Sequence, residues 1–382
     1  GTQINPETGE PCADHDSDVV LLMDQETDLA LAPNAQNALI SVNRNFSAPV
    51  KIQQDLSDAE RLKLVTTETD SFAKWEALQT LSRAALLDMA TQIASGATPN
   101  VPTALVKAQA EATLATAGND PAFSAQLLTL PGVGELFMEM TPADPAAIYE
   151  AKRLVRAALQ AELKDAIFAS LDAAKADTGE FSPDAASAGR RSLNAAYIDL
   201  LSATGTDHAE RIYQAFDDAK NMTDTMAALR ALSYCGGTYY DQAVSAFEAK
   251  WKSSPLVMDK WFSVQSTRPD HDAIERVKTL LEHEDFDWKN PNRVRSVAGA
   301  FAMGNHVAFH DASGDGYALL GDVIRKVDPL NGALSARLLT SFEQWRRVDE
   351  KRQALAKQVL TELQNAKLSK NAMDIVSRAL AS

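Results

Sequence analysis

The strongest constraint on the fold is a succession of amphipathic helical patterns that runs from Ser57 to the end of the chain. The clearest pattern carries apolar residues at spacings of three and four, which is the period of one helical face. Its members are Ile148, Ala151, Val155, Leu159, Leu163, Ile167 and Leu171. This stripe predicts one helix of about seven turns. Asp144 and Pro145 before it are typical of a helix start, because an N-cap residue is followed by proline at the first helical position.

Similar start signals recur along the chain. Residues 57–60, Ser-Asp-Ala-Glu, form a capping box, in which each polar side chain accepts a backbone N–H of the other residue. Ser182-Pro183 and Asn290-Pro291 mark further starts. Roughly fifteen helices joined by short loops fit these signals. No clean repeat of fixed period is present, so the sequence predicts a mainly α protein, an irregular α/α superhelix with the character of a HEAT-like helical array.

Residues 1–55 follow a different pattern. Residues 19–23 and 38–42 are short runs with high β-propensity, and residues 46–52 alternate apolar side chains with polar residues or proline. Three or four strands are too few to close a sandwich. We therefore expect a partial β-sandwich, the C-terminal part of a small β-sandwich domain, at 1–55 and an α-superhelical domain at 56–382.

Charge and composition exclude several classes of partner. The 382 residues include 37 Lys and Arg against 52 Asp and Glu, a formal net charge of −15. Nucleic acids and anionic membrane surfaces both require clusters of basic residues, so we expect neither as a partner. No apolar run approaches the length that spans a bilayer. Cys12 and Cys235 are too few for a disulfide framework, which favours a cytoplasmic location.

The start of the chain suggests a larger protein. The sequence has no initiator methionine and no signal-peptide pattern, and it opens on residues 5–10, which are typical of a turn between elements. We interpret this as a cut inside a longer chain.

Two histidines raise the possibility of a metal site. His306 and His310 are four residues apart, a spacing that places both imidazoles on one face of a helix. The zinc peptidase pattern requires a glutamate directly after the first histidine, and Val307 occupies that position. The alternative is a helix end or loop in which one histidine is hydrogen-bonded.

A second candidate is a calcium loop. Asp311, Ser313, Asp315, Gly316 and Asp322 fall at positions 1, 3, 5, 6 and 12 of the calcium-loop pattern. Serine at position 3 and aspartate at position 12 depart from that pattern. A glycine-rich loop that caps a helix from Tyr317 explains the same residues.

The segment at 290–296, Asn-Pro-Asn-Arg-Val-Arg-Ser, is the most informative for function. Arg293 and Arg295 in the first turns of a helix oppose the positive end of its dipole, so their presence requires a reason. One reason is the binding of carboxylates or carbonyls at a cleft. The other is a salt bridge to an acidic residue such as Asp285 or Asp287.

Six segments in order resemble the C-terminal region of the bacterial aminopeptidase N (alanyl aminopeptidase) family of zinc metallopeptidases. They are Phe-Ser-Ala-Pro-Val-Lys at 46–51, Asp-Ser-Phe-Ala-Lys-Trp-Glu-Ala at 70–77, Asn-Met-Thr-Asp at 221–224, Leu-Val-Met-Asp-Lys-Trp-Phe at 256–262, Asn-Pro-Asn-Arg-Val-Arg-Ser at 290–296, and Ala-Phe-His at 308–310 with Gly-Asp-Gly-Tyr at 314–317. The likeness extends from about residue 37 to the C-terminus.

The resemblance implies an enzyme that removes N-terminal residues from peptides, with a catalytic domain, a small β-sandwich and a closing α-superhelix. The family's zinc and catalytic motifs are absent from this sequence, so the zinc cofactor is expected in the parent enzyme and no catalytic residue is assigned here. The expected partners are the N-terminal catalytic domain and peptide substrates. Asn292, Arg293 and Arg295 are the candidates for lining the peptide chamber. The alternative is a free-standing HEAT-like scaffold that binds protein partners.

Overall fold

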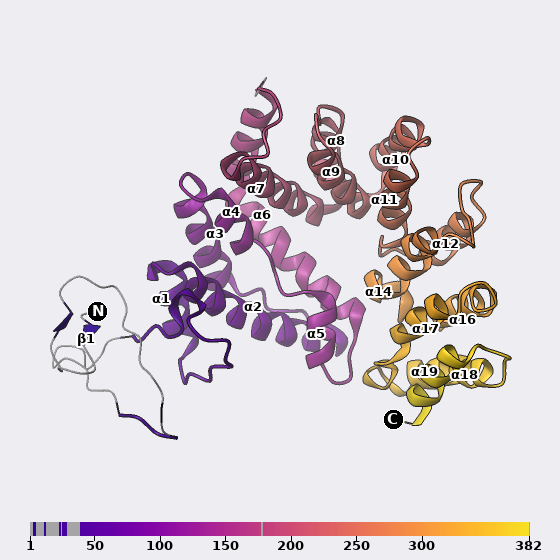
Figure 1. Ribbon diagram of the computed structural model, residues 1–382. Coiled ribbons are helices and arrows are strands. Elements are labelled where there is room, and N and C mark those ends of the chain that lie inside the picture. Colours follow the sequence, from indigo (N-terminus) through magenta and orange to yellow (C-terminus); the bar gives the residue numbers. More distant parts are fainter. Residues whose placement is uncertain are drawn as a thin grey trace. The chain divides into compact units, whose positions relative to one another are not determined.

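The computed structural model describes residues 3–4, 11–12, 23, 25–28, 39–176 and 179–381 (Figure 1). Contacts divide the chain into two compact units, Gly1–Leu81 and Ser82–Ser382. The second helix runs from one unit into the other. The expected division at residue 55 stays a prediction.

Helices dominate the described residues of the second unit, whereas residues 39–57 of the first unit are largely irregular. In the first unit and across its end lie β1 (Gln3–Ile4), β2 (Pro11–Cys12), the 3₁₀ helix η2 (Arg44–Phe46), α1 (Asp58–Thr67) and α2 (Ser71–Ala94). The next helices are α3 (Thr103–Ala117), α4 (Pro121–Leu127), α5 (Val133–Glu139), α6 (Pro145–Ala176), α7 (Ala185–Leu201), η3 (Ser202–His208), α8 (Ala209–Asp217), α9 (Met222–Cys235), α10 (Gly237–Trp251), α11 (Pro255–Ser266) and α12 (Ala273–Leu281). The last are α13 (Pro291–Val294), η4 (Arg295–Gly299), α14 (Ala300–Gly304), α15 (His306–Phe309), α16 (Asp315–Val327), α17 (Gly332–Leu339), η5 (Thr340–Phe342), η6 (Trp345–Arg347), α18 (Glu350–Gln364) and α19 (Lys370–Ala381).

The predicted β-sandwich is not seen in the described part of residues 1–55. β1 and β2 form a two-residue antiparallel ladder in which Gln3 faces Cys12. Residues 19–22 and 38 lie outside the described residues, and neither residue 23 nor residues 39–42 adopt strand structure.

The strand predicted at residues 46–52 is wrong. Asn43, Asn45 and Phe46 have left-handed φ values of 54°, 57° and 51°, which an extended strand does not tolerate. Phe46, Val50 and Ile52 remain exposed. Alternating polarity indicates a strand only where a neighbouring strand takes up the backbone hydrogen bonds, and none does so among the described residues of this segment.

The predicted capping box at the start of α1 is confirmed. The Glu60 N–H donates to Ser57 Oγ at 3.3 Å, and the Ser57 N–H donates to Glu60 Oε2 at 2.8 Å. These bonds satisfy two of the four N–H groups that a helix start leaves without partners.

We expect Ser57→Ala to lower the free energy of unfolding by about 1 kcal/mol, because the N-cap oxygen is lost. Ser192→Ala is the control, since Ser192 is exposed on α7 and its hydroxyl donates to the Ala188 carbonyl of its own helix. Thermal unfolding of both variants measures the difference. Equal midpoints would show that the capping box does not stabilise the fold.

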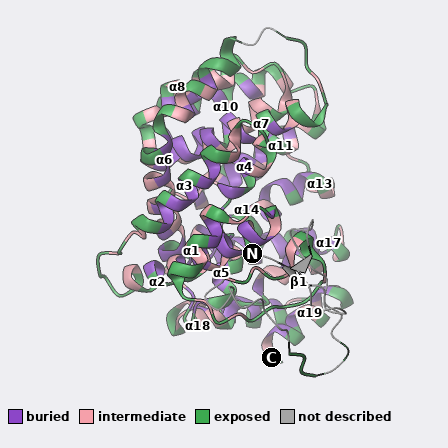
Figure 2. Ribbon diagram, turned by 90° about the vertical axis from the view of Figure 1, so that its left-hand side faces the viewer, coloured by how far each residue is buried: buried purple, intermediate pink, exposed green. Residues whose placement is uncertain are grey.

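The long helix predicted from the apolar stripe is also confirmed. The carboxylate of Asp144 accepts the N–H groups of Ala146 and Ala147 at 3.0 and 3.1 Å, and α6 begins at Pro145. Every residue of the stripe is buried, and Figure 2 shows how buried residues follow the inner sides of the neighbouring helices. Burial of this face holds α6 in the apolar core of the second unit.

In Ser82–Ser382, successive helix–helix contacts lead from α6 through later helices and back to α6. α6 packs on α7, α7 on α9, α9 on α10, α10 on α11, α11 on α14 and α14 on α15. α15 then contacts α6 again, although about 150 residues separate them in sequence. The α/α array expected from the sequence is present, and in this unit it forms a closed series of contacts.

Candidate functional site

The predicted site segment lies at a helix start, as expected. The Asn290 side chain accepts the N–H groups of Asn292 and Arg293 at 3.0 and 3.4 Å, and α13 begins at Pro291. After Val294 the helix widens into the π-helical turn η4 and continues as α14. Insertions of this kind occur frequently at functional sites. Arg295 is the first residue of the π-helical turn.

Arg293 points into the protein. Its side chain is 5% exposed, and its Nε lies 3.2 Å from Asp259 Oδ1 on α11. The guanidinium also lies 4.5 Å from the ring centroid of Phe262, and Nη2 donates to the Pro255 carbonyl at 3.4 Å. Asp259 therefore takes the role that the sequence suggested for Asp285 or Asp287. These contacts join α13 to the start of α11.

Asn292 and Arg295 lie on the surface. Arg295 Nη1 donates to Asn292 Oδ1 at 2.8 Å, and both residues are exposed. The structure thus brings two of the three predicted site residues together and turns the third away from them. Leu256 follows Pro255 at the start of α11 and is 72% exposed.

The two histidines form a stacked pair rather than a metal site. Their rings are 6.2 Å apart between centroids and only 2° from parallel. His310 Nδ1 shares a hydrogen bond of 2.8 Å with the Tyr317 hydroxyl, as the alternative interpretation expected. Burial lowers the pKa of both imidazoles, that of His310 to about 3, helped by the neighbouring His306 and Arg352.

The calcium-like loop caps a helix. Asp311 Oδ1 accepts the Ser313 N–H at 2.8 Å, Ser313 Oγ accepts the Asp315 N–H at 3.2 Å, and α16 begins at Asp315. Asp322 lies on the same helix and pairs with Arg325 at 2.8 Å. Across residues 39–176 and 179–381 and the shorter described stretches, no three His, Cys, Asp or Glu side chains are arranged to hold a metal ion.

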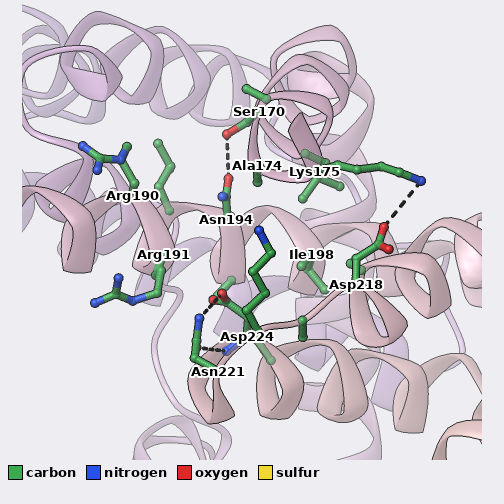
Figure 3. A pocket seen from close by; sticks show the side chains of 18 of the residues that line it. Ser170, Ala174, Lys175, Arg190, Arg191, Asn194, Ile198, Asp218, Asn221 and Asp224 are labelled. Carbon is green, nitrogen blue, oxygen red and sulfur yellow. Dashed lines mark hydrogen bonds and ion pairs between the residues drawn. The ribbon is translucent and has the colours of Figure 1, made fainter. Parts of the chain in front are cut away.

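A surface pocket of about 510 Å³ opens beside the end of α6, between α7, α8 and α9 (Figure 3). Most of its charged and polar groups satisfy one another. Lys175 pairs with Asp218 at 3.4 Å, and Asn221 Nδ2 donates to Asp224 Oδ2 at 2.6 Å. Ser170 donates to Asn194 Oδ1 at 2.6 Å.

Sequence reasoning missed this pocket. Arg190 and Arg191 on its rim have no carboxylate partner among the described residues, and Arg191 lies 4.7 Å from the ring centroid of Phe181. Two adjacent arginines in an acidic chain are the sequence signal that points to this surface. The pocket itself depends on how α6, α7, α8 and α9 pack against one another, so no local pattern predicts it.

Comparison with known proteins identifies the family to which this helical array belongs. Residues 58–381 match the family described as "Domain of unknown function (DUF3458_C) ARM repeats". The chain belongs to this family. The matched region covers the α/α array from the first residue of α1 to the last residue of α19.

Relatives of the ARM-repeat chain are aminopeptidases. It is 37% identical over 369 residues to Aminopeptidase N of Caulobacter vibrioides, covering 96% of the chain and 42% of that protein. It is 32% identical over 338 residues to Aminopeptidase N of Escherichia coli, covering 88% and 38%. A crystal structure of Legionella pneumophila aminopeptidase A in complex with aspartic acid superposes with a TM-score of 0.77 at 30% identity, covering 89% of the chain and 40% of that protein.

The chain therefore corresponds to the C-terminal ARM-repeat domain of the aminopeptidase N family, as the resemblance implied. It spans about two fifths of the length of these relatives. The zinc of that family does not fit the histidines present here. Zinc sites use at least three protein ligands, and His310 Nδ1 is already bonded to Tyr317. In the described residues, no helix is both long and apolar enough to cross a bilayer.

Proposed function

We propose that this chain is a non-catalytic, C-terminal portion of a zinc aminopeptidase that removes N-terminal residues from peptides. The observation that carries the proposal is the match of 96% of the chain to Aminopeptidase N at 37% identity. The zinc would be held by residues outside this chain. The helical array would cap the active site and line the route by which peptides reach it.

The candidate chamber residues have different parts in this proposal. Asn292 and Arg295 are exposed and hydrogen-bonded to each other, so they are available to a peptide carbonyl or carboxylate. Arg293 would act indirectly, because its contacts with Asp259 and Phe262 hold α13 in place. We also infer that residues 1–55 complete the small β-sandwich of the whole enzyme and that the α-superhelical domain begins at residue 56. The cytoplasmic location stays a prediction from the low cysteine content.

Activity assays test the proposal. The chain alone should not hydrolyse alanine or arginine arylamides in the presence of zinc, whereas the longer product of the same gene should do so. Turnover by the purified chain above the level of contaminating enzyme would contradict the non-catalytic assignment.

The lining role requires a separate measurement in the longer product. Arg295→Ala should raise KM for tripeptides and longer peptides about tenfold, which corresponds to the loss of one charge-assisted hydrogen bond. The small arylamide should keep its KM because it does not extend to this surface. An unchanged KM for every peptide length would remove Arg295 from the chamber.

The rival function is a free-standing helical scaffold that binds protein partners. It predicts an open reading frame that begins near residue 1, whereas the aminopeptidase proposal predicts an upstream H-E-x-x-H motif in the same gene. Sequencing the region upstream decides between the two.

A further inference from the structure

The closed series of helix contacts in Ser82–Ser382 depends on one junction. The Ala143 N–H donates to the Arg347 carbonyl at 2.7 Å. Arg347 Nη1 returns a hydrogen bond of 2.7 Å to the Met138 carbonyl. These reciprocal bonds join the end of α5 and the segment that follows it to η6, which lies about 200 residues later in the chain.

The aromatic part of the junction is a stack of three rings. The Phe137 ring on α5 lies 4.9 Å from the His310 ring and 6.0 Å from the His306 ring, with interplanar angles of 22° and 24°. A Cβ added to Gly134 would come within 3.2 Å of His306 Nε2. Glycine at this position therefore leaves the space that the imidazole occupies.

Charged and polar groups surround the imidazoles on several elements. Arg352 on α18 donates from Nε to the His310 carbonyl at 2.7 Å, and its Nη1 lies 3.7 Å from Asp144 Oδ2 and bonds Asp349. Tyr317 on α16 bonds His310 Nδ1, while His306 Nδ1 is buried without a hydrogen-bond partner among the described residues. The Asp311 carboxylate follows in the loop, and backbone and side-chain hydrogen bonds from Ser313 help to lower its pKa.

We propose that this junction is an acid-sensitive clasp, closed at neutral pH and opened by protonation of its two histidines. One side of the clasp consists of Gly134, Phe137, Ala143 and Asp144, and the other side consists of His306, His310, Arg347 and Arg352. Protonation would place two like charges 6.2 Å apart, beside the Arg352 guanidinium and between apolar rings.

The sign of the effect follows from burial. Both imidazoles have a pKa below the ordinary value in the closed state, and that of His310 is about 3. In the open state each would return to about 6.5. The closed state is therefore fully stabilised above that value and loses stability as the pH falls below it. Between about pH 7.5 and about pH 5.5, the opening equilibrium should rise by about tenfold from His310 alone, and by up to about a hundredfold when both imidazoles are protonated.

Hydrogen exchange of the wild-type chain tests the clasp directly. After correction for the intrinsic pH dependence of exchange, amides of residues 133–144 and 304–311 should exchange faster at about pH 5.5 than at about pH 7.5. α9 is the internal reference, because it contains no histidine. Unchanged exchange in the clasp segments would overturn the proposal. An equal rise in α9 would also overturn it, since that result means global acid unfolding.

A pair of variants assigns the response to the imidazoles. His306→Gln/His310→Gln should abolish the acid response, because the amide does not titrate. His271→Gln should retain the response, since His271 is 89% exposed and, among the described residues, pairs only with Asp272 beside it. The same acid response in the double variant would overturn the proposal. If the double variant does not fold, the exchange pattern of the wild-type chain still supports or overturns the proposal by itself.

Discussion

Gly316→Ala is expected to lower the free energy of unfolding by about 3 kcal/mol, the upper part of the range for overpacked sites. A Cβ at this position would lie 2.5 Å from the Phe309 carbonyl oxygen, 2.6 Å from the Ala308 carbonyl oxygen and 2.7 Å from Phe309 Cα. All three are backbone atoms, so no side-chain rotation relieves the clash. α15 and α16 would have to move apart at a point where Phe309 and Tyr317 are completely buried. Chemical denaturation followed by far-ultraviolet circular dichroism measures the loss.

Gly118→Ala is the matched control. Gly118 ends α3 with a φ of −77°, and an added Cβ would meet nothing within 4 Å. Alanine there should be neutral or should stabilise the protein by about 0.5 kcal/mol, because it reduces the freedom of the unfolded chain. Similar stabilities for the two variants would mean that α15 and α16 approach each other less closely than described.

The second large effect is expected for Arg293→Met, at about 3 kcal/mol of destabilisation. Methionine keeps much of the stem but leaves Asp259 without its cation and Phe262 without the guanidinium. Removal of one partner from a buried ion pair typically costs about 3–5 kcal/mol. We expect the lower end because the Asp259 side chain remains 20% exposed and can be partly hydrated.

Arg295→Met is the control for this prediction, since the same change two residues away affects an exposed side chain. It should shift the free energy of unfolding by no more than about 0.5 kcal/mol. A double-mutant cycle with Asp259→Asn then isolates the energy of the pair. No coupling between Arg293 and Asp259, or equal losses for the two arginine variants, would contradict the structural role of Arg293.

Local features of the helices were predictable because each depends on residues within one or two turns. Ser57 and Glu60 satisfy each other's N–H groups, and Asp144 caps α6 with no contribution from distant residues. The stripe from Ile148 to Leu171 repeats at the helical period, so its burial follows from the sequence as soon as any apolar partner is present.

The wrong strand prediction and the missed partner of Arg293 both concern contacts with residues outside the local segment. The alternation at residues 46–52 predicted a strand, but strand formation depends on a pairing partner and on φ values that Phe46 does not have. The cation of Arg293 required an acidic partner, and proximity in sequence favoured Asp285 or Asp287. Packing of α13 on α11 supplied Asp259 instead.

Residue patterns alone indicated that this protein is an acidic array of helices, where several of those helices begin, and which family it resembles. These properties depend on composition and on the hydrogen-bonding and apolar periodicity of short segments. Packing between distant segments buries Arg293 while it leaves Arg295 exposed, stacks His306 and His310 on Phe137, and brings α15 against α6. Those contacts join residues that are up to about 170 positions apart, and packing rather than local pattern selects which of them meet.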